Sequence, residues 1–207
     1  MSHSSTSRDR QMRQRLAQEA ARIIVESGTH DFLLAKRKAA QHLGAHDTRQ
    51  LPSNQEIEQA LVEYQRLFRS QTQPQRLQQL RETALEAMHF FTAYEPRLVG
   101  PVLTGTADVN TPVSLHVFTD TAEDISFTLL EHHIPFDIAD KTLRIGMDEH
   151  ASFPGYRFIA NEIVVEVIVF PVSKRLPTPL SPVDGRPMPR ANQTTLEQLL
   201  DAALQNP

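Results

Sequence analysis

The sequence predicts an α+β fold, in which an N-terminal helical region is followed by a mixed β-sheet with flanking helices. Up to about residue 93, apolar residues recur at intervals of three and four, which is the spacing of one face of an α-helix. After Pro96 the pattern changes to alternating and β-branched runs, which are typical of strands. The change at Pro96 therefore separates a helical half from a sheet-bearing half.

The helical half begins with residues 1–12, which are predicted to be a disordered lead-in, and continues as a helical region over 13–74. Ser53 and Glu56 form a capping box, in which each side chain accepts a hydrogen bond from an otherwise unpaired backbone N–H group. Glycines at 28 and 44 are expected to end the first two helices. The predicted helices span about residues 11–27, 31–42, 53–70 and 75–93.

The second half is predicted to contain an α/β domain over residues 75–172 and an extended Pro-rich tail over 173–207. The nearly continuous apolar run at 163–170 indicates a central strand covered on both faces. Thr194 and Glu197 predict a capping box for a short helix in the tail. Strands are predicted at about 97–104, 113–118, 135–145, 155–160 and 162–170, with helices at about 121–133 and 195–204.

Composition limits the function classes that this chain can serve. The sequence has 207 residues and no cysteine, which excludes disulfides, thiolate metal sites and cysteine catalysis. It has no apolar run long enough to cross a membrane and no secretory signal at its start, so a cytoplasmic protein without a membrane partner is expected. The net charge of −4 arises in residues 98–207, which makes that half a poor general surface for nucleic acid.

The segment 97–120 carries the most informative pattern in the chain. It predicts a strand, a turn containing Gly100 and Gly105, a second strand, and then the start of a helix. This order, over roughly residues 80–170, resembles the polymerase-β-type nucleotidyltransferase superfamily. The resemblance implies that Gly100, Gly105, Thr106 and Ser114 contribute to ligand binding, with backbone N–H groups of the small turn close to phosphates.

In that family an Asp-x-Asp pair and a third carboxylate hold two Mg²⁺ or Mn²⁺ ions, which align a nucleoside triphosphate. The pair would fall on Pro112 and Ser114, or on Ser114 and His116, and neither alignment supplies two carboxylates. Glu166 matches the place of the third carboxylate, which makes it a candidate metal ligand. The alternative for Glu166 is an acid paired with a nearby arginine.

Three other residues are candidates for chemistry. Asp108 and Asp120 flank the second strand and could supply relocated carboxylates. His116 lies in the middle of that strand and could act as a ligand or general base, because imidazole titrates near neutral pH. The alternative for His116 is a half-buried, hydrogen-bonded histidine.

A different pattern in the N-terminal half suggests nucleic-acid binding. The basic run Lys36, Arg37 and Lys38 lies in a predicted helix. The spacing of alanines, isoleucines and glycines over residues 20–44 resembles the first two helices of tetracycline-repressor-type helix-turn-helix domains. The eight residues AHDTRQLP separate this pair from the next helix, whereas that family continues within a few residues.

The leading hypothesis from the sequence is a degenerate nucleotidyltransferase-like protein. It would bind a nucleotide, RNA or a protein partner without the standard two-metal catalysis. One alternative is a DNA- or RNA-binding regulatory protein that uses the N-terminal helices. Another is an active, Mg²⁺- or Mn²⁺-dependent nucleotidyltransferase with relocated carboxylates.

Overall fold

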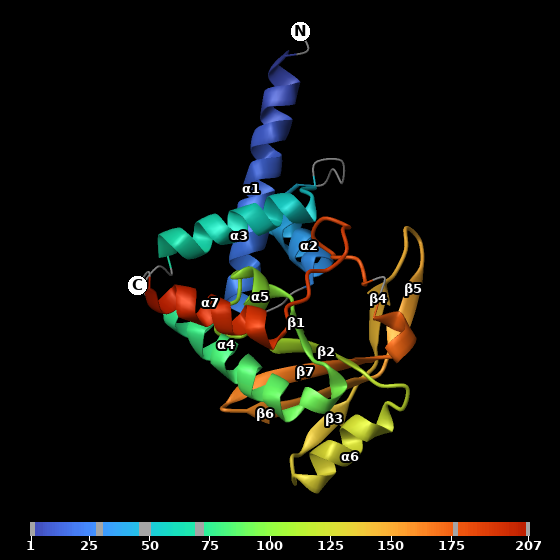
Figure 1. Ribbon diagram of the computed structural model, residues 1–207. Coiled ribbons are helices and arrows are strands. Elements are labelled where there is room, and N and C mark those ends of the chain that lie inside the picture. Colours follow the sequence, from blue (N-terminus) through green and yellow to red (C-terminus); the bar gives the residue numbers. More distant parts are fainter. Residues whose placement is uncertain (1–2, 28–30, 46–50, 69–72, 176–177, 206–207) are drawn as a thin grey trace. The chain divides into compact units, whose positions relative to one another are not determined.

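The computed structural model describes residues 3–27, 31–45, 51–68, 73–175 and 178–205, and it confirms the α+β class (Figure 1). The chain divides into two compact units, which are described separately. Unit 1 comprises residues 1–73 with 182–184, and unit 2 comprises 74–181 with 185–207.

Unit 1 is built from three helices, α1 (His3–Ser27), α2 (Phe32–His42) and α3 (Asn54–Phe68), and α1 packs against both of the others. Asp31 caps α2 by accepting hydrogen bonds from the backbone N–H groups of Leu33 and Leu34. The predicted capping box of α3 is confirmed, because Ser53 N–H donates to Glu56 Oε2 (2.6 Å) and Glu56 N–H donates to Ser53 Oγ (3.2 Å). The buried core consists of Leu16, Ala17, Ala20, Ala21, Ile23, Ile24, Val25, Ala35, Ala39, Ile57, Ala60 and Leu61.

The start of α1 differs from the sequence prediction. The helix begins at His3, inside the segment 1–12 that was predicted to be a disordered lead-in. That prediction relied on the absence of an apolar stripe before Met12. Arg and Gln, which fill much of residues 8–15, are good helix formers, so this stretch is helical although none of the side chains at 9–15 is buried.

Unit 2 contains a five-stranded sheet with the strand order β1-β2-β7-β6-β3. Strands β2 and β7 run parallel, and every other neighbouring pair is antiparallel. The prediction that residues 163–170 form a central strand is confirmed, because β7 lies between β2 and β6. The strands are β1 (Arg97–Val99), β2 (Val113–Phe118), β3 (Phe136–Ile138), β6 (Gly155–Ala160) and β7 (Ile163–Phe170).

One face of this sheet is covered by helices. Leu115 and Val117 of β2 and Val167 of β7 are fully buried against side chains from α4 (Gln73–Phe90), α6 (Glu123–Glu131) and α7 (Gln193–Gln205) (Figure 1). These contacts form the main hydrophobic core of unit 2, and their burial is its largest source of stability. The helices contribute Leu80, Ala84, Ala87, Met88, Ile125, Leu129 and Leu196.

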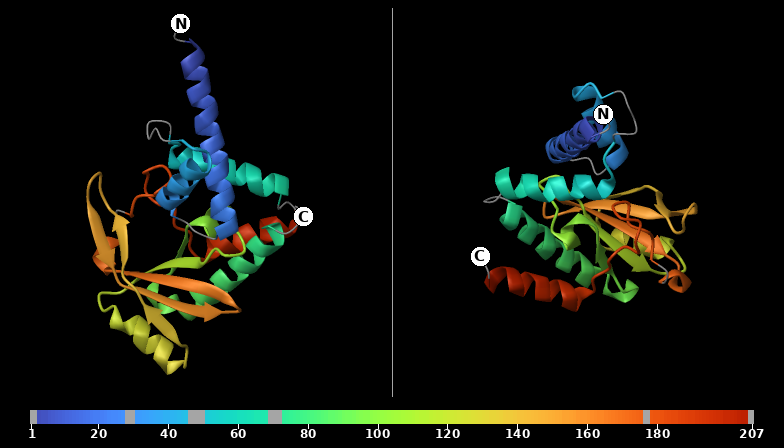
Figure 2. Two further views of the ribbon diagram at one scale, coloured as in Figure 1. Left: turned by 180° about the vertical axis from the view of Figure 1, so that it is seen from behind. Right: turned by 90° about the horizontal axis from the view of Figure 1, so that it is seen from above.

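The opposite face, which we call the polar face, carries Ser114, His116 and Phe118 of β2. A smaller hydrophobic cluster covers one end of it, where Phe118 and Phe170 pack with Phe153. Phe153 belongs to a separate two-stranded sheet of β4 (Lys141–Arg144) and β5 (His150–Phe153), which Figure 2 shows beside the main sheet. Glu166 of β7 and Arg157 of β6, which lie opposite each other, share this face.

Two strand predictions differ from the structure. The strand predicted at 97–104 ends at Val99, because Gly100 has a φ of +73° and Pro101 begins a four-residue helix, α5 (Pro101–Thr104). The strand predicted at 135–145 is two strands in different sheets. The chain changes sheet near Ala139, whose carbonyl oxygen would lie 2.3 Å from a Cβ atom at Gly155. Only glycine at 155 permits this approach.

The tail returns to the free edge of the main sheet. Leu98 of β1 and Ala191 exchange two backbone hydrogen bonds, of 2.8 and 2.9 Å. The capping box predicted at Thr194 is wrong, because Asn192 accepts the hydrogen bonds from Thr195 N–H and Thr195 Oγ1. Asn is among the strongest N-cap residues, and α7 therefore begins before the predicted position.

Candidate functional site

The candidate site lies on the polar face of unit 2, where the parallel strands β2 and β7 meet. Their register places Ser114 opposite Glu166 and His116 opposite Ile168. Ser114 and His116 alternate along β2, so their side chains share one face of the sheet with Glu166. In the alignment that places the pair on Ser114 and His116, the three carboxylate positions of the family are therefore neighbours, and one of the three holds a carboxylate.

The Glu166 carboxylate lies between two cationic side chains. Lys141 Nζ is 3.5 Å from Glu166 Oε2, and Arg157 Nε is 4.0 Å from Glu166 Oε1. Arg157 lies directly opposite Glu166 on the antiparallel strand β6. This geometry fits the alternative in which Glu166 is paired with a nearby arginine, and it adds a lysine. Among the residues that the structure describes, no group of three or more His, Cys, Asp or Glu side chains could hold a metal ion.

His116 is fully buried and serves as a hydrogen-bond acceptor. Its Nδ1 atom accepts a hydrogen bond of 3.0 Å from Arg190 Nε, and its ring lies 4.5 Å from that of Phe170, centroid to centroid. Burial, followed by the nearby positive charge of Arg190, lowers the pKa of His116 to about 3. The imidazole is therefore neutral at physiological pH, which fits the structural alternative for this residue.

Arg190 is a site residue that the sequence did not reveal, because it lies in a Pro-rich segment without periodicity. Its guanidinium lies over the rings of Phe118 and Phe170, 5.1 and 4.9 Å from their centroids. Nη1 donates a 2.6 Å hydrogen bond to the carbonyl oxygen of Arg175. Burial, followed by the charge of Arg97, lowers the pKa of Arg190 to about 10, so the side chain remains a cation at neutral pH.

Two further arginines accompany Arg190. Arg97 lies opposite His116 in the β1–β2 pair, and the Arg175 guanidinium lies 5.8 Å from the centroid of the Phe118 ring. Both contact the same acid, because Glu95 Oε1 is 2.5 Å from Arg175 Nη2 and Glu95 Oε2 is 3.8 Å from Arg97 Nη2. We refer to Arg97, Arg175 and Arg190 as the arginine cluster.

The predicted ligand-binding turn is a short helix with glycine at both ends. Gly100 and Gly105 cap α5, with φ values of +73° and +86°. Thr106 is buried, and its Oγ1 atom lies 3.2 Å from Thr104 Oγ1. Arg81 of α4 donates to the Val102 carbonyl oxygen and holds this segment against the helix. The two glycines therefore serve the chain reversal between β1 and β2.

The two candidate relocated carboxylates have structural roles. Asp108 is buried, and its Oδ1 atom accepts hydrogen bonds from Asn110 N–H and Thr111 Oγ1, which fixes the turn before β2. Asp120 Oδ1 accepts a 2.9 Å hydrogen bond from Val172 N–H, which ties the end of β2 to the chain after β7.

The basic run of unit 1 lies on α2. Arg37 and Lys38 are exposed, whereas Lys36 is half-buried, and burial lowers its pKa. The third helix, which would have to present a recognition surface, carries Glu56, Glu58 and Glu63. Phosphate would be repelled by these acids.

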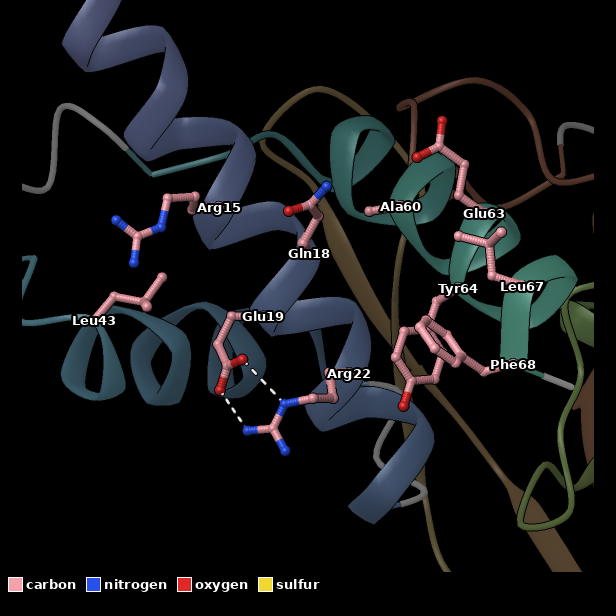
Figure 3. Close-up of a pocket in the computed structure, with 10 residues that line it drawn as sticks. All are labelled: Arg15, Gln18, Glu19, Arg22, Leu43, Ala60, Glu63, Tyr64, Leu67 and Phe68. Carbon is pink, nitrogen blue, oxygen red and sulfur yellow. Dashed lines mark hydrogen bonds and ion pairs between the residues drawn. The ribbon is translucent and has the colours of Figure 1, made fainter.

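Unit 1 also contains a groove of about 430 Å³ (Figure 3). Its charged wall consists of Arg22 and Glu19 of α1, which form an ion pair of 2.7 Å. Its apolar wall includes Tyr64 and Phe68 of α3, whose ring centroids are 4.8 Å apart. The Glu19–Arg22 pair is satisfied within the protein, and the lining also includes Arg15, Gln18 and Glu63.

No protein-family model, no curated protein and no solved structure matches the chain. Within the described parts of the chain, none of the helices has the length and apolar character needed to cross a membrane.

Proposed function

We propose that this chain is a degenerate nucleotidyltransferase-like protein, which binds a nucleotide without the standard two-metal catalysis. The observation that carries the proposal is the register of β2 and β7. It makes neighbours of Ser114, His116 and Glu166, which one of the two alignments matches to the three carboxylates of the family. Two of these positions hold neutral side chains.

Side-chain cations occupy the surroundings in which the family uses metal ions. Lys141 and Arg157 lie within ion-pair distance of Glu166, and Arg190 donates a hydrogen bond to His116. A site whose positive charge comes from the protein does not need divalent ions to attract a polyphosphate. The proposal therefore separates nucleotide binding from metal-dependent transfer.

Thermal unfolding of the purified protein tests this proposal. We expect at least one nucleoside triphosphate to raise the midpoint in the presence of EDTA, because a ligand that binds only the native state stabilises it by mass action. A shift that requires Mg²⁺ or Mn²⁺, together with metal-dependent transfer of label from the triphosphate, would instead support an active enzyme. No shift with any nucleotide at millimolar concentration would refute the proposal.

A further inference from the structure

The arginine cluster contains more positive charge than the protein compensates. Two of its three guanidinium groups share one carboxylate, that of Glu95, which contacts Arg175 at 2.5 Å and Arg97 at 3.8 Å. Arg190 forms no ion pair with any residue that the structure describes. Its hydrogen bonds go to a neutral imidazole and a backbone carbonyl.

A half-buried cation without a counter-ion is unusual, because removing a charge from water is costly unless an opposite charge or several hydrogen bonds replace the solvent. In Arg190 the Nη2 atom is buried and has no hydrogen-bond partner among the described residues. The imidazole Nε2 of His116 is likewise buried without a partner in the described chain. Two polar atoms at the same place thus lack the partners that a folded protein normally supplies.

The fold holds this cluster in place. Arg97 is fixed by β1, and the backbone pairing of Leu98 with Ala191 fixes the residue that follows Arg190. The rings of Phe118 and Phe170 form a floor under the Arg190 guanidinium. A cation positioned by a sheet and by two aromatic rings loses little conformational freedom when it binds a ligand.

We infer that the arginine cluster is a binding site for phosphate groups, and that it takes the polyphosphate of the ligand without metal ions. Guanidinium N–H groups match the oxygens of a phosphoryl group, and the partly exposed side chains of Arg97 and Arg175 bring such donors to the surface beside Arg190. The assignment deepens the proposed function, since it rests on nucleotide binding for the identity of the whole ligand. Inorganic pyrophosphate contains the chemistry that this site recognises.

Isothermal titration calorimetry with pyrophosphate, in EDTA and at constant ionic strength, tests the assignment. Arg97→Gln and Arg175→Gln are the informative variants, because both side chains are partly exposed, at 32% and 45%. We expect each to weaken pyrophosphate binding roughly tenfold or more, since a hydrogen bond to a charged group is lost. Arg37→Gln removes the same charge from an exposed position in unit 1 and is expected to bind like the wild type.

Arg190→Lys provides a second test that retains the positive charge. It is expected to weaken binding as well, because lysine lacks the fork of donors and the flat face that lies on Phe118 and Phe170. Circular dichroism on each variant shows whether the fold is retained. If Arg190→Lys does not fold, the two Gln variants still decide the question.

The same titration with nucleoside triphosphates distinguishes the two proposals. Binding of triphosphate but not of pyrophosphate, unchanged in the Arg97 and Arg175 variants, would overturn the arginine site and leave the proposed function standing. Binding of pyrophosphate with no added affinity from any nucleoside would support the arginine site and count against the proposed function. Binding of neither would overturn both. Equal weakening by Arg37→Gln would show a non-specific charge effect and would also overturn the site.

Discussion

The two units of this protein treat their charged side chains differently. In unit 1 four partly buried charged residues, Arg13, Glu19, Arg22 and Glu56, form ion pairs. Arg13 contacts Glu56 at 2.8 Å, and Glu19 lies 2.7 Å from Arg22 and 2.8 Å from His42. The hydrogen bonds with Arg13 and with Arg22 lower the pKa values of Glu56 and Glu19 to about 2.

Unit 2 instead places Arg190 against a neutral histidine and two aromatic rings. The pairs of unit 1 are complete within the protein and contribute to helix packing, whereas the cation of unit 2 lacks a counter-ion among the described residues. The comparison shows two ways of holding a charge in the fold, and the inferred phosphate site depends on the second.

Removal of the Phe170 ring is expected to have the largest effect. Phe170 is 1% exposed and lies 4.4 Å from the Phe153 ring, centroid to centroid. Phe170→Ala should lower the free energy of unfolding of unit 2 by about 3–5 kcal/mol, measured by urea denaturation. It should also weaken pyrophosphate binding, because the Arg190 guanidinium loses its contact with the Phe170 ring. Ile57→Ala, a core truncation in unit 1, should leave binding unchanged; a loss there would contradict the division of roles.

Acid sensitivity of His116 is the second expected effect. Its native pKa of about 3 lies below the value of 6.5 in the unfolded chain, so the unfolded state takes up the proton first. The contribution of His116 to stability is therefore complete above pH 6.5 and is lost as the pH falls, by about 2 kcal/mol at pH 5. His116→Asn should reduce this loss in urea denaturation at pH 7, 6 and 5. Equal losses in both proteins would show that another group is responsible.

In unit 1, Glu56 allows the cap and the ion pair to be separated. Glu56→Ala removes both and should cost roughly 1 kcal/mol, whereas Glu56→Gln keeps the capping hydrogen bond and should cost a few tenths. Because the native pKa is below the ordinary value of 4.5, the contribution of the carboxylate is lost as the pH falls from 4.5 towards 2. Thermal unfolding of the two variants measures the difference, and equal costs would refute the assignment of the cap.

The smallest effect is expected for Glu166. Its pairs with Lys141 and Arg157 are 3.5 and 4.0 Å long and partly exposed, so Glu166→Gln should change stability by no more than about 0.5 kcal/mol. Triphosphate binding in EDTA should persist in this variant. Loss of a metal-dependent shift or of label transfer in Glu166→Gln would favour the active-enzyme alternative.

Much of the fold could be predicted from local patterns. The capping box of Ser53 and Glu56 and the central strand at 163–170 depend on neighbouring residues, and both are confirmed. Errors occurred where the chain leaves a regular pattern. The strand His150–Phe153 was missed because four residues carry too little alternation, and the strand at 135–145 was not divided because the approach to Gly155 is a tertiary contact.

The candidate site was predictable only in part. Glu166, Ser114 and His116 were singled out from their spacing, and the register of β2 and β7 brings them together. The arginine cluster was not predicted, because Arg97, Arg175 and Arg190 lie in separate segments of the chain and share no local motif. Asp108 and Asp120 were candidates because carboxylates suit metal binding. In the fold, the Oδ1 atom of each accepts hydrogen bonds that hold the chain on either side of β2.

The sequence by itself determined the α+β class, the division into a helical half and a sheet-bearing half, and the absence of cysteine chemistry, because periodicity, capping residues and composition act locally. Only the tertiary structure decided that Glu166 has cationic neighbours, that His116 is buried and neutral, and that Arg190 lies against it. Burial and ion pairing depend on which distant segments meet. The backbone pairing of Leu98 with Ala191 brings the tail, and with it Arg190, to the polar face.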